Sequence, residues 1–301
     1  MGEPVLTIGL PVYNGGMSLK SAIDSLRSQT YRDFILHISD NASTDETPFI
    51  CRAAAQLDGR VVYTRQPENV GGYENFRFVL QSARTPFFMW AAHDDYWKPT
   101  FVEKNLGLLI NDQRATASIS RVAFQRGGTQ IYYSKSTHAL KGTISENLHD
   151  FLANPVDASR FYAVHRTENL KRCFPTITPF HAFDWLVVAL TLLEGHYLEW
   201  PEVLLFREAP NPNRYSKLVR RDNSGLLTRL FPGMPLTYQL IRRLPRCYLR
   251  HILRDLGRIN REQHYAYMKY FHPKGFRIEQ KIYRKSGMRA LLKLVKAGWP
   301  R

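Results

Sequence analysis

The strongest constraint on the fold of this chain is an alternation of strand-like and helix-like segments in its N-terminal third. Four apolar runs are separated by segments whose apolar residues recur every three or four positions, the period of an amphipathic helix. The strand-like runs are residues 4–14, 34–39, 60–66 and 86–92, and the helix-like segments are residues 18–29, 43–57 and 73–83. The alternation predicts an α/β fold, in which helices cover both faces of a mostly parallel central sheet.

Each predicted strand is followed by a loop rich in Asp, Asn or Gly. The loops read "PVYNGG", "SDNASTD", "PENVGG" and "HDD", starting at Pro11, Ser39, Pro67 and His93. The carboxyl ends of parallel strands meet at one edge of a sheet, and ligands of open α/β sheets bind outside that edge. The sequence therefore predicts that the four loops form one polar binding site.

Two of these loops carry candidate ligand-binding carboxylates. Asp94 and Asp95 directly follow an apolar run, and because buried charges are costly, they lie either in a solvated turn or on a cation. Carboxylates suit Mg²⁺ or Mn²⁺, which complete their shells with waters and substrate phosphates. Asp40 either hydrogen-bonds a ribose or base, or forms an Asx-turn before the next helix.

The middle of the chain shows fewer signals. Residues 100–110 and 183–195 have helical patterns, residues 202–208 read as a short strand, and Gly127-Gly128 indicates a hairpin turn. The 3 cysteines lie far apart without a CxxC pair, so neither a disulfide framework nor a zinc site is expected. Since no apolar run is long enough for a membrane span and no signal peptide is apparent, a cytoplasmic location is expected.

Positive charge is concentrated at the C-terminal end. Residues 225–301 carry 18 Lys/Arg and 3 Asp/Glu, whereas residues 1–224 carry 24 and 23. This asymmetry predicts a body of residues 1–224 and a basic, mainly helical region of residues 225–301. Within that region, Arg246, Arg250, Arg254 and Arg258 recur every four residues opposite a leucine-rich face. Such a helix either lies on an anionic membrane surface or packs its apolar face on the body.

Four motifs together resemble the family 2 glycosyltransferases. The segments "LPVYNGG", "ISDNASTDET", "NVGGYENF" and "WAAHDDYW" follow the order and spacing of that family, closely over residues 5 to about 100 and more loosely to about 207. The resemblance implies the GT-A fold, an αβα sandwich that binds a nucleotide-diphospho-sugar. It also implies a transferase that moves a sugar to an acceptor hydroxyl with the help of a divalent cation, Mg²⁺ or Mn²⁺.

The resemblance also implies roles for individual residues. Tyr13 would lie against the base, Asp40 would bind the uracil or ribose, and Asp94 would bind the metal with Asp95 beside it. Ala92 stands where the family often has the first Asp of its metal motif, which puts the strength of metal binding in question. The residues expected to bind the nucleotide-sugar are Pro11, Tyr13, Asn14, Asp40, Asn69, Gly71, Gly72, Asp94 and Arg207.

Two further residues of the site are implied by looser matches. Asp184, at the start of a predicted helix, matches the catalytic base, which would make the enzyme inverting; alternatively, Asp184 simply caps its helix. Arg207 matches an arginine that reaches the donor diphosphate in relatives; the alternative is a surface salt bridge to Glu208 or Glu202.

The expected function is that of an inverting glycosyltransferase. A UDP-sugar is the expected donor, with dTDP and GDP as alternatives, and the acceptor would be a glycan or a lipid-linked precursor of a cell-surface polysaccharide. The protein would work in the cytoplasm or as a peripheral protein on the inner membrane face. Two rival functions are a non-catalytic, degenerate transferase fold, suggested by Ala92, and a basic nucleic-acid-binding protein. The second rival leaves the four loops unexplained, so no nucleic acid partner is expected.

Overall fold

The computed structural model describes residues 3–153, 155, 157–180, 182–209, 228 and 230–271. The chain forms two compact units. The first consists of Met1–Asn147, Asn154–Ile177 and Val187–Ala209, and the second of Leu148–Ala153, Thr178–Leu186 and Pro210–Arg301. The expected boundary at residue 225 lies outside the described residues, so it stays a prediction.

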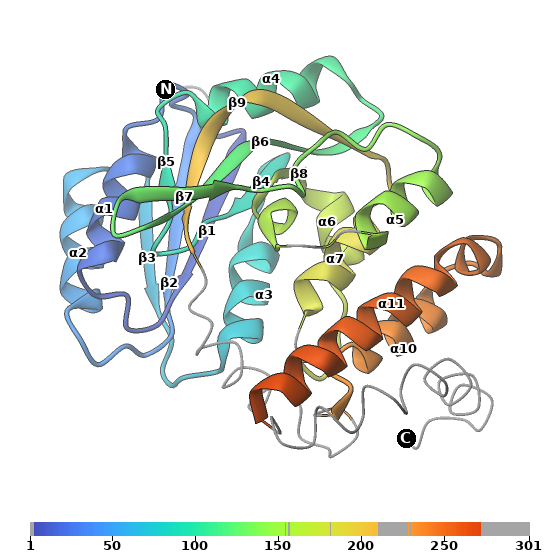
Figure 1. Ribbon diagram of the computed structural model, residues 1–301. Helices are drawn as coiled ribbons and strands as arrows, with labels where there is room; N and C mark the ends of the chain where they lie inside the picture. The colour runs from blue at the N-terminus through green and yellow to red at the C-terminus, as the bar shows by residue number, and fades with distance from the viewer. Residues whose placement is uncertain are drawn as a thin grey trace. The chain divides into compact units, whose positions relative to one another are not determined.

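The first unit is built on a single mixed sheet with the strand order β3-β2-β1-β4-β8-β6-β9-β5 (Figure 1). Its N-terminal half consists of β1 (Leu6–Val12), β2 (Phe34–Asp40), β3 (Val61–Arg65) and β4 (Phe87–Trp90). All neighbours in this half run parallel, as the alternating sequence pattern predicts. Strand β1 lies between β2 and β4 and is buried along its whole length, which explains why all its residues except Thr7 are apolar.

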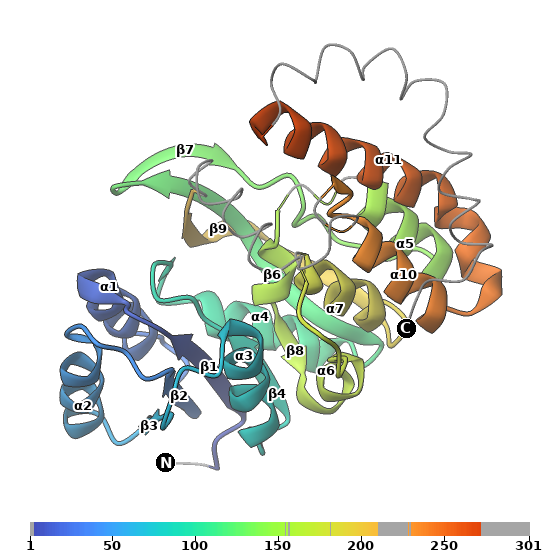
Figure 2. The same cartoon turned by 90° about the horizontal axis from the view of Figure 1, so that it is seen from below.

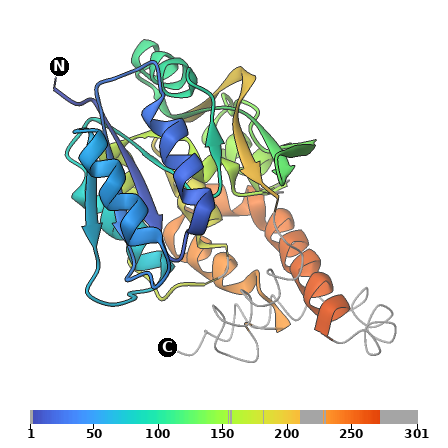
Figure 3. The same ribbon diagram turned by 90° about the vertical axis from the view of Figure 1, so that its left-hand side faces the viewer.

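Helices cover both faces of this parallel half, which confirms the predicted layering. The helices are α1 (Gly16–Arg27), α2 (Thr47–Leu57) and α3 (Gly72–Ser82). Figure 2 shows α1 and α2 on one side of β1–β3 and α3 on the other, and Figure 3 shows α1 and α2 side by side. Right-handed crossovers explain this arrangement, because the chain moves outward from β1 to β3 and then returns to β4.

The other half of the sheet mixes parallel and antiparallel pairs. It contains β5 (Tyr96–Trp97), β6 (Ala115–Arg126), β7 (Thr129–Tyr133), β8 (Val164–Arg166) and β9 (His196–Glu208), together with α4 (Phe101–Asn111), α6 (Thr167–Cys173) and the 3₁₀ helix η1 (Ser159–Tyr162). Strand β6 runs parallel to β9 and antiparallel to β7 and β8. The predicted hairpin is confirmed, since Gly127 and Gly128 have φ values of 56° and 82° in the turn between β6 and β7.

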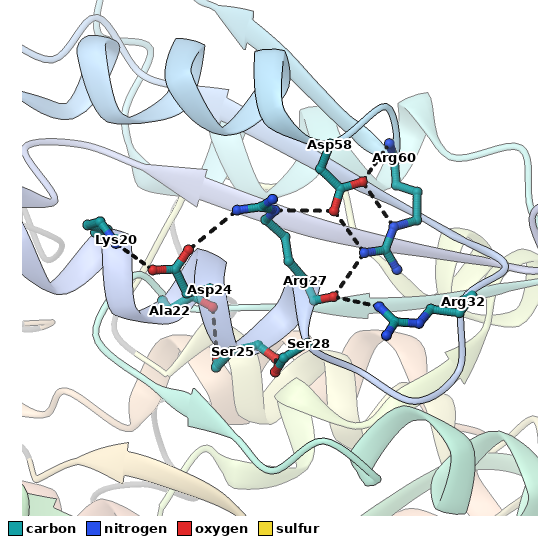
Figure 4. Close-up of polar contacts among 9 residues, drawn as sticks. All are labelled: Lys20, Ala22, Asp24, Ser25, Arg27, Ser28, Arg32, Asp58 and Arg60. Atoms are coloured by element: carbon teal, nitrogen blue, oxygen red, sulfur yellow. Dashed lines mark hydrogen bonds and ion pairs between the residues drawn. The ribbon is translucent and has the colours of Figure 1, made fainter.

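A polar cluster ties α1 and α2 together at the amino ends of the strands, opposite the predicted ligand edge (Figure 4). Asp58 accepts hydrogen bonds from Arg60 Nη2 at 2.8 Å and from Arg27 Nε at 3.2 Å. Arg60 and Arg27 hold the pKa of Asp58 well below its usual range. This acid is fully engaged in joining the two helices to β3, so it has a structural role.

Every secondary-structure element with given bounds in the described part of the second unit is a helix. It contains the end of α5 (Ile144–Ala153), the first turn of α7 (Phe183–Thr191), α10 (Met234–Arg243) and α11 (Arg246–Phe271). Arg258 of α11 donates to the carbonyl of Leu152 at 2.6 Å, and Asn260 of α11 donates to Thr237 of α10 at 2.6 Å. Within the described part of the chain, no helix is both long and apolar enough to span a bilayer.

Candidate functional site at the carboxyl edge of the sheet

The loops after β1 and β2 are joined directly to each other. Asn14, with a left-handed φ of 50°, donates its backbone N–H to Ser43 Oγ at 2.9 Å and accepts the N–H of Thr44 on Oδ1 at 2.9 Å. The backbone N–H of Gly15 donates to Thr47 Oγ1 at 2.8 Å. Asparagine tolerates the left-handed region better than most residues do, which explains its presence at this turn.

Asp40, the last residue of β2, is fully buried and has protein donors on both carboxylate oxygens. Oδ1 accepts the N–H of Ser43 at 2.8 Å, whereas Oδ2 accepts Tyr63 Oη at 2.9 Å and Arg65 Nη1 at 2.7 Å. Burial and the bond to Asp40 raise the pKa of Tyr63 to about 12. This arrangement favours the turn-forming alternative for Asp40. The same arrangement places the partly exposed guanidinium of Arg65 at the site. The sequence analysis missed Arg65, because its only signal is its position at the end of a strand.

The third loop is held to the second by asparagine side chains. Asn41 donates to Asn69 Oδ1 at 2.9 Å and accepts the N–H of Val70 at 2.9 Å. Gly71 follows with a φ of 86°, a conformation that L side chains rarely adopt, although a Cβ at this position would meet no other atom. The glycine is therefore needed for the backbone of this exposed rim.

The rim of the site contains most of the predicted nucleotide-binding positions. Tyr13 is 47% exposed, and Asn14, Asn69, Gly71 and Gly72 are also exposed. Pro11, in contrast, is buried within β1. The structure thus brings together the predicted positions of the first three loops, with Pro11 beneath the rim.

The fourth loop contains two carboxylates in different environments. Asp94 is half-buried, and among the described residues its carboxylate has no hydrogen bond or ion pair. Asp95 is buried and accepts Arg207 Nε on Oδ2 at 3.0 Å and the N–H of Glu208 on Oδ1 at 3.3 Å. Burial raises the pKa of Asp95 to about 6, and the charge of Arg207 opposes that rise. Asp94 therefore has oxygens available for a ligand, whereas those of Asp95 are already engaged.

Arg207 is enclosed by aromatic rings as well as by its carboxylate partner. Its guanidinium carbon lies 4.2 Å from the ring centroid of Tyr162 and 5.6 Å from that of Phe124. Only 13% of its side chain is exposed. Neither expectation for Arg207 anticipated this buried pair with Asp95, 112 positions away in sequence.

Asp184 belongs to the second unit, at the start of α7. Its Oδ1 accepts the N–H of Trp185 at 2.9 Å, and its side chain is half-buried. This bond to a backbone N–H in the first turn of α7 is what the helix-capping alternative for Asp184 predicts. The base role of Asp184 remains a prediction.

The described residues include no group of three or more His, Cys, Asp or Glu side chains that could hold a metal ion by themselves. A single carboxylate still fits Mg²⁺ or Mn²⁺, since such ions are commonly held by one or two carboxylates and by substrate phosphates. Asp94 therefore fits a cation that a bound diphosphate would share. Together, the four loops offer an aromatic ring, amides, backbone N–H groups and one available carboxylate.

Comparison with protein families gives one match over residues 7–174, more than half of the chain, to the family described as Glycosyl transferase family 2. Glycosyltransferase GlyA of Streptococcus pneumoniae is 24% identical over 166 residues, which are 55% of this chain and 22% of that protein. The uncharacterized glycosyltransferase RT0329 of Rickettsia typhi is 29% identical over 107 residues, 36% of this chain and 32% of that protein. The matches thus span about a third or less of these curated relatives.

Two solved structures share the fold. TarS 1-349 of S. aureus, in complex with UDP-GlcNAc, has a TM-score of 0.62 and 15% identity, covering 94% of this chain and 78% of TarS 1-349. The mannosyltransferase PcManGT from Pyrobaculum calidifontis, in complex with GDP-Man and Mn²⁺, has a TM-score of 0.60 and 17% identity, covering 99% and 81%. At these identities the likeness concerns the fold alone, and it confirms the predicted GT-A αβα sandwich.

Proposed function

This chain belongs to glycosyl transferase family 2, and we propose that it transfers a sugar from a nucleotide-diphosphate donor to an acceptor hydroxyl. The observation that carries the proposal is Asp94, a half-buried carboxylate without a protein partner among the described residues, at the edge where four polar loops meet. The rim of Tyr13, Asn14 and Asn69 would bind the nucleoside. UDP is the expected nucleotide, with dTDP and GDP as alternatives.

Asp94 would hold a Mg²⁺ or Mn²⁺ ion at this site. The cation would neutralise the charge that develops on the leaving diphosphate. Because both oxygens of Asp95 already accept hydrogen bonds, Asp95 would support the loop, and Asp94 would be the ligand of the ion. Likewise, Asp40 would contribute by fixing Ser43 and Arg65, which leaves the Arg65 guanidinium near the nucleotide rim.

Asp184 would remove the proton of the acceptor hydroxyl. A hydroxyl is a weak nucleophile, and a positioned carboxylate base assists its attack. Direct attack on the anomeric carbon from the side opposite the leaving diphosphate inverts its configuration. The reaction proposed for this chain is therefore an inverting transfer, with a glycan or lipid-linked acceptor.

The basic region supports a place at the cytoplasmic membrane surface, but not through its apolar face. Ile252, Leu256 and Ile259 of α11 are buried, so they are not available to enter a bilayer. The arginines at 246, 250 and 254 are exposed, and within the described residues they form no ion pair. Anionic lipid would thus be bound by charge at this arginine stripe.

A calorimetric titration of UDP, dTDP and GDP, each with and without Mn²⁺, tests the donor site. We expect one nucleotide to bind in a Mn²⁺-dependent manner to the natural protein, and Asp94→Asn to remove that dependence. Asp24→Asn is the matched control, because Asp24 is an exposed acid of α1 that pairs with Lys20. No binding of any nucleotide would refute the proposal. If a nucleotide binds but the protein releases no nucleotide from any nucleotide-sugar, the non-catalytic transferase fold is favoured instead.

A further inference from the structure

Strand β7 exposes a cluster of large apolar side chains that the donor site does not use. Ile131, Tyr132 and Tyr133 are 49%, 43% and 58% exposed. Among the described strands, β7 pairs only with β6, so it forms an edge of the sheet (Figure 2). Contiguous exposed apolar patches mark binding sites, so each face of this strand is a candidate.

The two tyrosines of β7 differ in what lies beneath them. Successive side chains of a strand point to opposite faces, so Tyr132 and Tyr133 are on different sides of the hairpin. Tyr132 pairs with Phe124 of β6, and their rings stack with centroids 4.8 Å apart and planes 21° apart. Phe124 is itself buried. One face of the Tyr132 ring is therefore fixed on the core.

The stacked pair continues across the sheet toward the fourth loop. Phe124 is the register partner of Arg207 in β9, and the Arg207 guanidinium carbon lies 5.6 Å from its ring centroid. Arg207 in turn donates to Asp95 at 3.0 Å, next to Asp94. Tyr132, Phe124, Arg207 and Asp95 thus form a continuous row from an exposed ring to the carboxylates of the candidate site.

The carboxylate of Asp157 is hydrogen-bonded to Ser134, two residues after Tyr132. Burial and the charge of Asp157 raise the pKa of Tyr132. Asp157 is held in place by Ser134 Oγ and Ser136 Oγ, each at 2.8 Å. Both oxygens of Asp157 are thus engaged by the protein, so the feature that Tyr132 offers to a ligand is its ring face.

We propose that the exposed ring face of Tyr132 is a platform for one pyranose ring of the acceptor. A pyranose presents an apolar C–H face, which matches the exposed face of an aromatic ring. The platform lies at one end of the row that leads to Asp94. The acceptor role rests on the proposed function, whereas sugar binding by the ring is testable without it.

Saturation-transfer NMR with methyl β-D-glucopyranoside, methyl β-D-galactopyranoside and methyl N-acetyl-β-D-glucosaminide tests the platform. We expect at least one of these glycosides to bind, and Tyr132→Ala to raise its dissociation constant about tenfold, as loss of one aromatic contact would. Tyr132→Phe should retain binding, because the ring remains. Tyr133→Ala is the matched control: it removes the same side chain from the other face of the same strand.

Three outcomes would overturn the platform: no binding of any glycoside, an equal loss in Tyr133→Ala, or an unchanged affinity in Tyr132→Ala. The natural protein could instead self-associate, with Tyr132→Ala and Tyr133→Ala abolishing the association equally. That result would show that β7 binds a second copy of the chain. The nucleotide titration is run on the same variants and should not change in Tyr132→Ala. A natural protein that binds glycosides but no nucleotide would refute the proposed function and leave the sugar platform standing.

Discussion

Arg207 of β9 and Asp95, which precedes β5, form a buried ion pair with Nε and Oδ2 3.0 Å apart. Removing one partner of such a pair leaves an uncompensated buried charge, which costs about 3–5 kcal/mol. We expect Arg207→Met to lower the free energy of unfolding by roughly that amount, and Arg207→Met with Asp95→Leu to recover much of it. Urea unfolding measures both variants.

The control for this ion pair is Arg77→Met. Arg77 pairs with Glu74 on the exposed surface of α3, where an ion pair contributes little. Equal losses in the single and the double variant would show that packing of the arginine against Tyr162 and Phe124, rather than charge, stabilises this region.

Asp184→Asn should slow transfer by a factor of about 10²–10⁴, the usual contribution of a general base, and leave nucleotide affinity unchanged. The rate is measured as release of the nucleotide from sugar donors that carry the nucleotide preferred in the titration, with water as the acceptor. Early NMR spectra of the released sugar give its anomeric configuration, which should be opposite to that of the donor. Asp150→Asn, at an exposed acid of α5, serves as the control. A full rate in Asp184→Asn would assign this acid to helix capping alone.

His165 in β8 should make the protein less stable in mild acid. It is buried between β4 and β6, and burial lowers its pKa to about 3. Below its ordinary pKa, the unfolded chain takes up a proton that the folded protein does not. The free energy of unfolding should therefore fall by about 1.4 kcal/mol for each pH unit between roughly pH 6.5 and pH 3.

Urea unfolding at several pH values compares the natural protein with His165→Leu, which should lack this component of the slope. His251→Gln, at an exposed histidine of α11, should keep it. Parallel pH profiles for the natural protein and His165→Leu would contradict the prediction.

Reversal of the charge at Arg246, Arg250 and Arg254 to Glu should weaken binding to vesicles that contain anionic lipid by about a hundredfold or more. Sedimentation with anionic and with neutral vesicles, at low and at high salt, measures the effect. The matched control reverses three exposed arginines of the first unit, Arg52, Arg84 and Arg114, for the same change in net charge. If both triple variants lose binding equally, net charge rather than the stripe accounts for it.

The parallel half of the sheet could be predicted from sequence, because each of its strands is an apolar run followed by a polar loop. The mixed half could not. Strand β8 has only 3 residues and β5 only 2, too short for any periodicity, yet β8 joins the two halves of the sheet. The candidate site divides in the same way. The rim around Asn14 and Asn69 follows from local motifs, whereas the partnership of Asp95 with Arg207 depends on a contact between distant segments.

The hydrogen bonds from the backbone N–H of Asn14 to Ser43 Oγ and from the side chain of Asn41 to Asn69 have a consequence for affinity. Loops that order only on binding lose conformational entropy at that moment, and the loss weakens the complex. Here the first three loops are already ordered by one another, so that entropy is lost during folding. Donor affinity should then be governed mainly by electrostatics at Asp94, and substitution of Asn41 should weaken binding of every nucleotide alike, without changing which one is preferred.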